Sequence, residues 1–137
     1  MSGLAAVLAG RHEPGVHRWH SALHVPDVQH AVEHAGWTFG YLDGVALEER
    51  RAVLVAIGDA LGFPEHYGGN LDALNDCLRG LDKPTVLLWD TWGPFAREHE
   101  DAFGTICGVL GKRDESDPAL EVLLRGPGPE DGLASLD

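Results

Sequence analysis

A short apolar run after Pro84 is the feature that most restricts how this chain can fold. Thr85 to Trp89 is almost continuously apolar, although it has only the length of a strand. A strand without a polar side is typical of a parallel sheet whose two faces are both covered. We therefore expect Thr85 to Trp89 to be a central, buried strand.

Two more strand patterns and several helical patterns accompany this run. Trp37 to Leu42 alternates aromatic with smaller residues, and Leu120 to Leu124 is a short apolar segment. The helical patterns cover Asp27 to Ala35, Leu47 to Leu61, Leu71 to Leu81, and Pro94 to between Gly111 and Arg113. Helical crossovers between strands imply parallel pairing with right-handed connections. The sequence predicts an α/β fold in which helices pack on a small three-stranded parallel sheet.

The chain divides into three predicted segments. Residues 1–35 contain scattered Gly, Pro and His without a sustained period, and we interpret them as an N-terminal extension packed on the domain. The extension would hold a short strand at Val16 to Trp19 and the helix that follows Asp27. Residues 36–125 form the predicted domain, and the Gly- and Pro-rich residues 126–137 are expected to be a flexible tail.

The charge balance limits the classes of partner. The chain carries 22 acidic side chains against 10 basic ones, which gives a net charge of −12 at neutral pH. Nucleic-acid binding depends on neutralising phosphates with Lys and Arg, so we expect no nucleic-acid partner. A basic protein is the better-matched partner for such a chain.

Cysteine use and the apolar runs suggest a cellular compartment. Cys77 and Cys107 fall in two different predicted helices and form no C-x-x-C pair, so we expect reduced thiols and a cytoplasmic protein. Leu4 to Ala9 is too short and lacks the basic flank of a secretion signal. The longest internal apolar stretch, Ala52 to Ile57, cannot span a bilayer, so no membrane association is expected.

The helix predicted at Leu71 to Leu81 has two contrasting faces. Asn70 stands at the N-cap position, and the leucines at helical spacing make an inward face. The outward face carries Asp72, Asn75, Asp76 and Arg79. Such a face is usually only a solvated surface, and the helix macrodipole favours the charge of Asp72. Asp76 lies beyond the first turn, and a cationic partner would offset its repulsion with Asp72.

The segment from Phe63 to Gly80 resembles the signature segment of the barstar family, which comprises intracellular protein inhibitors of microbial ribonucleases. The agreement forms one ungapped block of Pro64, Glu65, Tyr67, Gly68, Asn70 to Leu74, Asp76, Cys77, Leu78 and Gly80. A weaker resemblance extends from Trp37 to Leu124. The family's order of strands and helices agrees with the order predicted above.

The resemblance implies a mechanism of inhibition by occlusion. The loop and the outward helix face would plug the active site of a basic, secreted, guanyl-specific ribonuclease in a 1:1 complex. Asp76 matches the family's phosphate-mimicking aspartate, and Asp72 matches its second acidic contact. The partner-binding residues carried over in this way are His66, Tyr67, Gly68, Gly69, Asn70, Asp72, Ala73, Asn75, Asp76 and Arg79. No cofactor, metal or catalytic residue is implied, and the free protein is expected to be a monomer.

Four positions depart from the family pattern, and one of them is Arg79, which replaces a neutral residue and would partly screen Asp76. His66 stands in place of a tyrosine, and Asn75 replaces a tryptophan, which removes a large apolar contact. Lys112 aligns with an outlying glutamate, although Asp114 or Glu115 is able to supply negative charge nearby. We therefore expect a target other than barnase itself.

Other functions explain fewer of these sequence features. An immunity or interaction module that neutralises a different basic toxin domain is the alternative. An enzyme would have to use His66 and the aspartates, but no nucleophile or phosphate loop accompanies them. His30 and His34 share a helix face, yet no zinc-ligand spacing is present, so no metal site is expected. His99 falls on the apolar stripe of the last helix and is expected to be partly buried.

Overall fold

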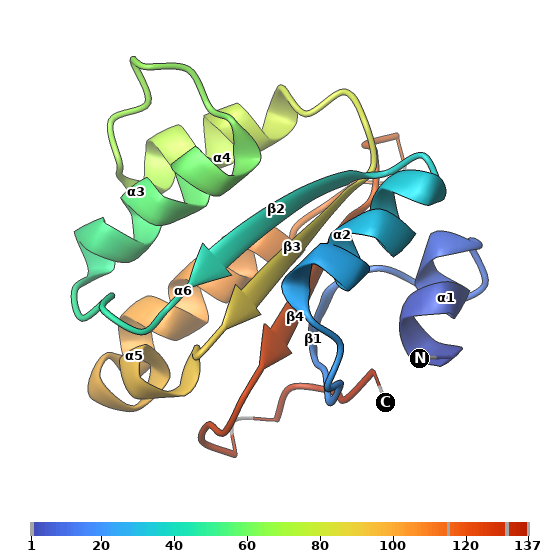
Figure 1. Ribbon diagram of the computed structural model, residues 1–137. Coiled ribbons are helices and arrows are strands. Elements are labelled where there is room, and N and C mark those ends of the chain that lie inside the picture. Colours follow the sequence, from blue (N-terminus) through green and yellow to red (C-terminus); the bar gives the residue numbers. More distant parts are fainter. Residues whose placement is uncertain (1, 115, 131, 137) are drawn as a thin grey trace.

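The computed structural model describes residues 2–114, 116–130 and 132–136. Within them, one parallel sheet holds the strands in the order β1, β4, β3, β2 (Figure 1). The strands are β1 (Val16–Arg18), β2 (Thr38–Asp43), β3 (Thr85–Asp90) and β4 (Leu120–Arg125). The helices are α1 (Ser2–Leu8), α2 (Val25–His34), α3 (Arg50–Leu61), α4 (Leu71–Arg79), α5 (Gly93–Glu98) and α6 (Glu100–Gly111). The predicted α/β class with a parallel sheet is confirmed.

Strand β3 lies inside the sheet, as its apolar run predicts. Every residue from Thr85 to Trp89 is buried. The strand pairs with β2 on one side and β4 on the other, so that Leu87 lies opposite both Gly40 and Val122. Burial of both its faces explains why β3 lacks the alternation of polar and apolar residues.

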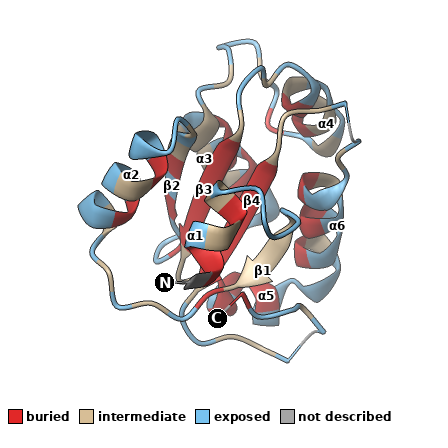
Figure 2. Ribbon diagram, turned by 90° about the vertical axis from the view of Figure 1, so that its right-hand side faces the viewer, coloured by how far each residue is buried: buried red, intermediate tan, exposed pale blue. Residues whose placement is uncertain are grey.

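Helices cover both faces of the sheet and give the molecule three layers (Figures 1 and 2). Helices α3, α4, α5 and α6 lie on one face, and α1 and α2 lie on the other. Alternate residues of β3 supply the two cores, because successive side chains of a strand point to opposite faces. Leu87 and Trp89 pack with the α3–α6 layer, whereas Val86 and Leu88 pack with the α1–α2 layer.

The prediction of three strands was wrong, because β1 adds a fourth to the sheet. Val16 lies opposite Val122 in parallel register. The strand at this place was predicted, but not its membership of the sheet. It has only three residues, which are too few for an alternation of polar and apolar residues to indicate a partner. β1 pairs with β4 because β3 occupies only one edge of β4, and the backbone groups of its other edge still need partners.

The first helix was not predicted. Residues Ser2–Leu8 form α1, in which Leu4 and Val7 are buried against the α2 face of the sheet. The same core includes Trp19 and Val28, so the N-terminal residues contribute to the packing of the whole molecule.

The long helix predicted from Pro94 is in fact two helices. The chain breaks at His99, whose φ and ψ of −135° and 63° are not helical, and α6 begins at Glu100. His99 is exposed rather than partly buried, although its ring centroid lies 5.3 Å from that of the buried Phe95. Within the residues that the structure describes, none of the helices has the length and apolarity needed to cross a membrane.

The C-terminal segment contacts β1. Leu136 donates its backbone N–H to the Arg18 carbonyl at 2.7 Å, and the Arg18 N–H donates to the Ala134 carbonyl at 2.9 Å. Leu136 is buried in the α1–α2 core. The division of the chain into an extension, a domain and a tail stays a prediction, but the described part of the last segment is held by these bonds.

Candidate functional site

Helix α4 has one buried face and one face that is exposed to solvent. Leu74 and Leu78 are buried in the core between α4, α3 and α6. Asn70 caps the helix as predicted, because its side-chain Oδ1 accepts the Ala73 N–H at 2.8 Å. A cap of this kind stabilises a helix by about 1 kcal/mol. The outward residues of α4 therefore stand on a helix whose start and inner face are both held.

The two aspartates of α4 are exposed on its outward face. Asp72 lies in the first turn and Asp76 lies one turn further along the helix. Asp76 Oδ1 is 3.8 Å from Arg79 Nη1, and both side chains remain more than two-thirds exposed, at 73% and 72%. An exposed ion pair of this length contributes well under about 1 kcal/mol. Asp76 is therefore open to a stronger cationic partner.

The loop before α4 is attached to α3 at its glycines. The Gly68 carbonyl accepts a hydrogen bond from Arg51 Nη1 at 3.2 Å. Gly69 is buried with a φ of 67°, and a Cβ atom there would lie 3.1 Å from Val55 Cγ2. Glycine adopts this backbone conformation without strain and leaves room for the neighbour. The loop consequently approaches α3 closely while Asn70 starts the next helix.

Tyr67 holds the same loop from inside. Its hydroxyl donates to the Leu54 carbonyl at 2.8 Å, and its ring meets Phe63 edge-on with centroids 5.0 Å apart. A Cβ atom at Gly58 would lie 2.6 Å from Tyr67 Cδ2, so only glycine leaves space for the ring. Burial raises the pKa of Tyr67 to about 12, and the hydroxyl remains a hydrogen-bond donor at neutral pH. The ring faces α3, in contrast to the exposed side chain of His66.

The structure brings the predicted partner-binding residues to one region, with different degrees of exposure. Those exposed to solvent are His66, Gly68, Asn70, Asp72, Asp76 and Arg79. Those of intermediate exposure are Tyr67, Ala73 and Asn75, and Gly69 is buried. The exposed residues are those that a partner can touch directly, Tyr67 and Gly69 support the loop, and Ala73 and Asn75 lie partly exposed on α4.

A groove of about 520 Å³ runs beside the last turn of α4. Asn75 and Arg79 line one side of it, and Lys112, Arg113 and Asp114 line the other. The outlying position predicted at Lys112 or Asp114 is therefore adjacent to α4, whereas Glu115 lies outside the described residues.

Arg113 was missed by the sequence analysis. Its Nη1 donates to the Leu78 carbonyl at 2.9 Å and its Nη2 donates to the Pro118 carbonyl at 2.8 Å. It therefore joins the end of α4 to the segment that leads into β4. A single arginine after a helix carries no local signal for the contact with α4, because the Leu78 carbonyl is 35 residues away in the chain.

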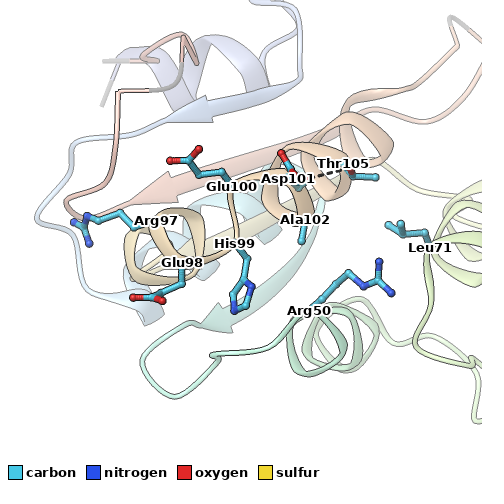
Figure 3. Close-up of a pocket in the computed structure, with 9 residues that line it drawn as sticks. All are labelled: Arg50, Leu71, Arg97, Glu98, His99, Glu100, Asp101, Ala102 and Thr105. Carbon is cyan, nitrogen blue, oxygen red and sulfur yellow. Dashed lines mark hydrogen bonds between the residues drawn. The ribbon is translucent and has the colours of Figure 1, made fainter.

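A second cavity, of about 580 Å³, lies near the start of α4 but apart from the aspartates. It is formed where the starts of α3 and α4 face the junction of α5 and α6 (Figure 3). Arg50 and Leu71 lie on one side of it and His99 on the other, while Arg97 points away from them. Neither Asp72 nor Asp76 lines this cavity. Among the described residues, no group of three or more His, Cys, Asp or Glu could hold a metal ion.

The fold and this face together define a small parallel α/β protein that presents an acidic, capped helix. Residues 37–124 match the family described as Barstar (barnase inhibitor), and the chain therefore belongs to the barstar family.

Two further similarities were found. A Bacillus subtilis (strain 168) protein named "Putative ribonuclease inhibitor YrdF" is 44% identical over 48 residues, which are 34% of this chain and 53% of that protein. The match thus spans about half the length of this relative. A solved structure of the Aeropyrum pernix ORC2 protein superposes on 93% of this chain and 39% of its own, with a TM-score of 0.65 and 16% identity. At that identity the likeness is one of fold alone.

Proposed function

We propose that this protein is a non-enzymatic inhibitor of a secreted, guanyl-specific microbial ribonuclease. It binds the enzyme 1:1 as a monomer in the cytoplasm, and α4 with its preceding loop covers the active site. Membership of the barstar family supports the inhibitor role. The net charge of −12 supports a basic protein as the partner.

One observation carries the proposal: Asp72 and Asp76 are exposed one turn apart on a helix that is rigidly held. A site that binds RNA phosphate presents Arg, Lys and His, and a carboxylate can take the place of the phosphate through charge-assisted hydrogen bonds. Asn70 and the buried Leu74 and Leu78 hold the helix before the partner arrives. Binding therefore orders few additional groups, which favours affinity.

In this proposal some loop residues contact the enzyme and others support the loop. His66 and Asn70 are exposed and contact the enzyme, with Gly68 allowing close approach of the backbones. Tyr67 and Gly69 support the loop through their contacts with α3. Ala73 and Asn75 lie at the edge of the contact, where Asn75 offers an amide in place of a large apolar surface.

The test is a titration of a small basic ribonuclease, purified from the culture medium of the producing organism, with the full chain. We expect RNA cleavage to fall linearly to zero at one equivalent, and the protein alone to leave RNA intact. Cleavage that continues at full strength beyond one equivalent contradicts the proposal. A tight basic partner without nuclease activity would instead support an immunity module against another toxin domain.

A further inference from the structure

The groove beside α4 is unusual in its charge. It is lined by three basic residues, Arg79, Lys112 and Arg113, although the whole chain has only 10. Two carboxylates, Asp114 and Asp117, also line it, so the basic residues exceed the acidic ones in a chain of net charge −12. The lining of this groove therefore has three positive and two negative side chains, a net charge of +1, next to the acidic face of α4.

One of the two carboxylates of the groove is engaged by the backbone. Asp117 Oδ2 accepts the backbone N–H of Asp114 at 2.8 Å and so shapes the turn between α6 and β4. Among the described residues, the salt bridges of the molecule include neither Lys112 nor Arg113. Arg79 has Asp76, but at 3.8 Å and with both side chains largely exposed. The basic side chains of the groove are therefore not neutralised by a close ion pair within the described part of the molecule.

Arg113 is a pre-oriented cation in this groove. Its guanidinium donates to the Leu78 carbonyl from Nη1 at 2.9 Å. It donates to the Pro118 carbonyl from Nε at 3.3 Å and from Nη2 at 2.8 Å. Carbonyl oxygens orient a guanidinium without cancelling its charge, and the fork has five N–H donors in all. Two of the five donors take no part in these bonds.

A carboxylate is the group that this arrangement fits best. An arginine fork pairs with the planar carboxylate, and long lysine and arginine side chains can close around it. A phosphate would meet the field of Asp72, Asp76, Asp114 and Asp117 as a doubly charged group, whereas a single carboxylate is repelled less.

We infer that the groove receives an acidic side chain of the target ribonuclease, placed beside that enzyme's basic active site. This inference rests on the proposed function and names the partner's surface. The complex would then have two contacts of opposite polarity. In one, the negative Asp72 and Asp76 face the enzyme's basic active site. In the other, the positive Lys112, Arg79 and Arg113 surround an acidic side chain of the enzyme. Opposed polarities fix the orientation of two proteins and reject partners with a basic residue at the second contact.

The test asks whether inhibition becomes weaker or stronger when one basic side chain is replaced by an acidic one. Reversing any exposed cation makes the inhibitor more negative and should slightly strengthen its attraction to a basic enzyme. Lys112→Glu should instead weaken inhibition by about 10-fold or more, because it places like charges together in the contact. Arg97→Glu is the matched control, since Arg97 is an exposed arginine of α5 outside the groove. Both variants are titrated against the ribonuclease at low and high salt, with thermal unfolding measured to show that they fold.

The outcomes separate the two proposals. Weaker inhibition by Lys112→Glu with unchanged or tighter inhibition by Arg97→Glu supports the acidic contact, and the effect should shrink as salt screens it. Equal or tighter inhibition by Lys112→Glu overturns the inference, while the proposed function stands if Asp76→Ala still weakens inhibition. An unmodified protein that leaves the ribonuclease active overturns both.

Discussion

Glu121 Oε2 lies 2.8 Å from His17 Nδ1, and this contact joins β4 to the short strand β1. The Glu121 side chain is fully buried, and its Oε1 also accepts the Gly15 N–H at 3.0 Å. A carboxylate inside a sheet is costly unless it is paired or protonated. One pair of ionisable side chains therefore adds to the backbone pairing and apolar packing that attach the N-terminal segment.

The first prediction concerns the pH dependence of stability. Burial raises the pKa of Glu121 to about 8, from an ordinary value of 4.5. The folded state therefore holds a proton that the unfolded state releases, so the stabilisation is complete below the unfolded pKa and is lost as pH rises through the folded one. Burial, followed by the charge of His12, lowers the pKa of His17, which acts in the opposite sense as pH falls.

Glu121→Gln isolates the effect, because His17 is present in both proteins. Urea unfolding should show the stability of the unmodified protein, relative to the variant, falling by about 2–4 kcal/mol between about pH 5 and about pH 9. A difference that is constant or increases with pH would show that Glu121 is ionised throughout.

The second prediction concerns the acidic face. Asp76→Ala should weaken ribonuclease inhibition by about 3–5 kcal/mol, because it leaves the enzyme's cationic site covered but unpaired. Asp82→Asn removes one charge from an exposed position after α4 and should change inhibition by less than about 0.5 kcal/mol. Surface plasmon resonance on both variants gives the comparison. Equal losses would contradict the assignment of Asp76.

The third prediction concerns the support of the loop. Gly58→Ala forces a methyl group against the Tyr67 ring and should destabilise the protein by about 1–3 kcal/mol. It should also weaken inhibition, because the loop moves with the ring. Gly104→Ala is the control, since a Cβ atom at this position of α6 meets nothing within 4 Å. It should stabilise the protein by about 0.5–1 kcal/mol through helix propensity alone. Thermal unfolding of the two variants checks the contrast, which fails if both shift in the same direction.

The fourth prediction concerns the N-terminal residues. Leu4 is fully buried in the core of the α1–α2 face, on the side of the sheet away from α4. Leu4→Ala should lower the free energy of unfolding by about 2–5 kcal/mol. Its inhibition constant, measured well below the unfolding temperature, should be unchanged. A large loss of inhibition in the folded variant would place the N-terminal residues in the contact.

Several elements could be predicted because their causes lie within a few residues of one another. The leucine spacing of α4 places Leu74 and Leu78 inward, and the Asn70 side chain reaches the Ala73 N–H only three residues away. The apolar run of β3 reflects the chemistry of its own residues, and it is buried as expected. The barstar resemblance is local in the same sense, since its signature is one ungapped segment.

What the sequence by itself determined is the class of the fold, the existence of the capped helix and the outward position of its two aspartates. The tertiary structure alone decided that β1 completes the sheet, that Glu121 is buried against His17, and that Arg113 reaches Leu78 beside α4. Each of these depends on contacts between residues far apart in the chain. Local periodicity and propensity carry no information about such contacts, because the partner is set by which edges and carbonyls remain unpaired once the layers have packed.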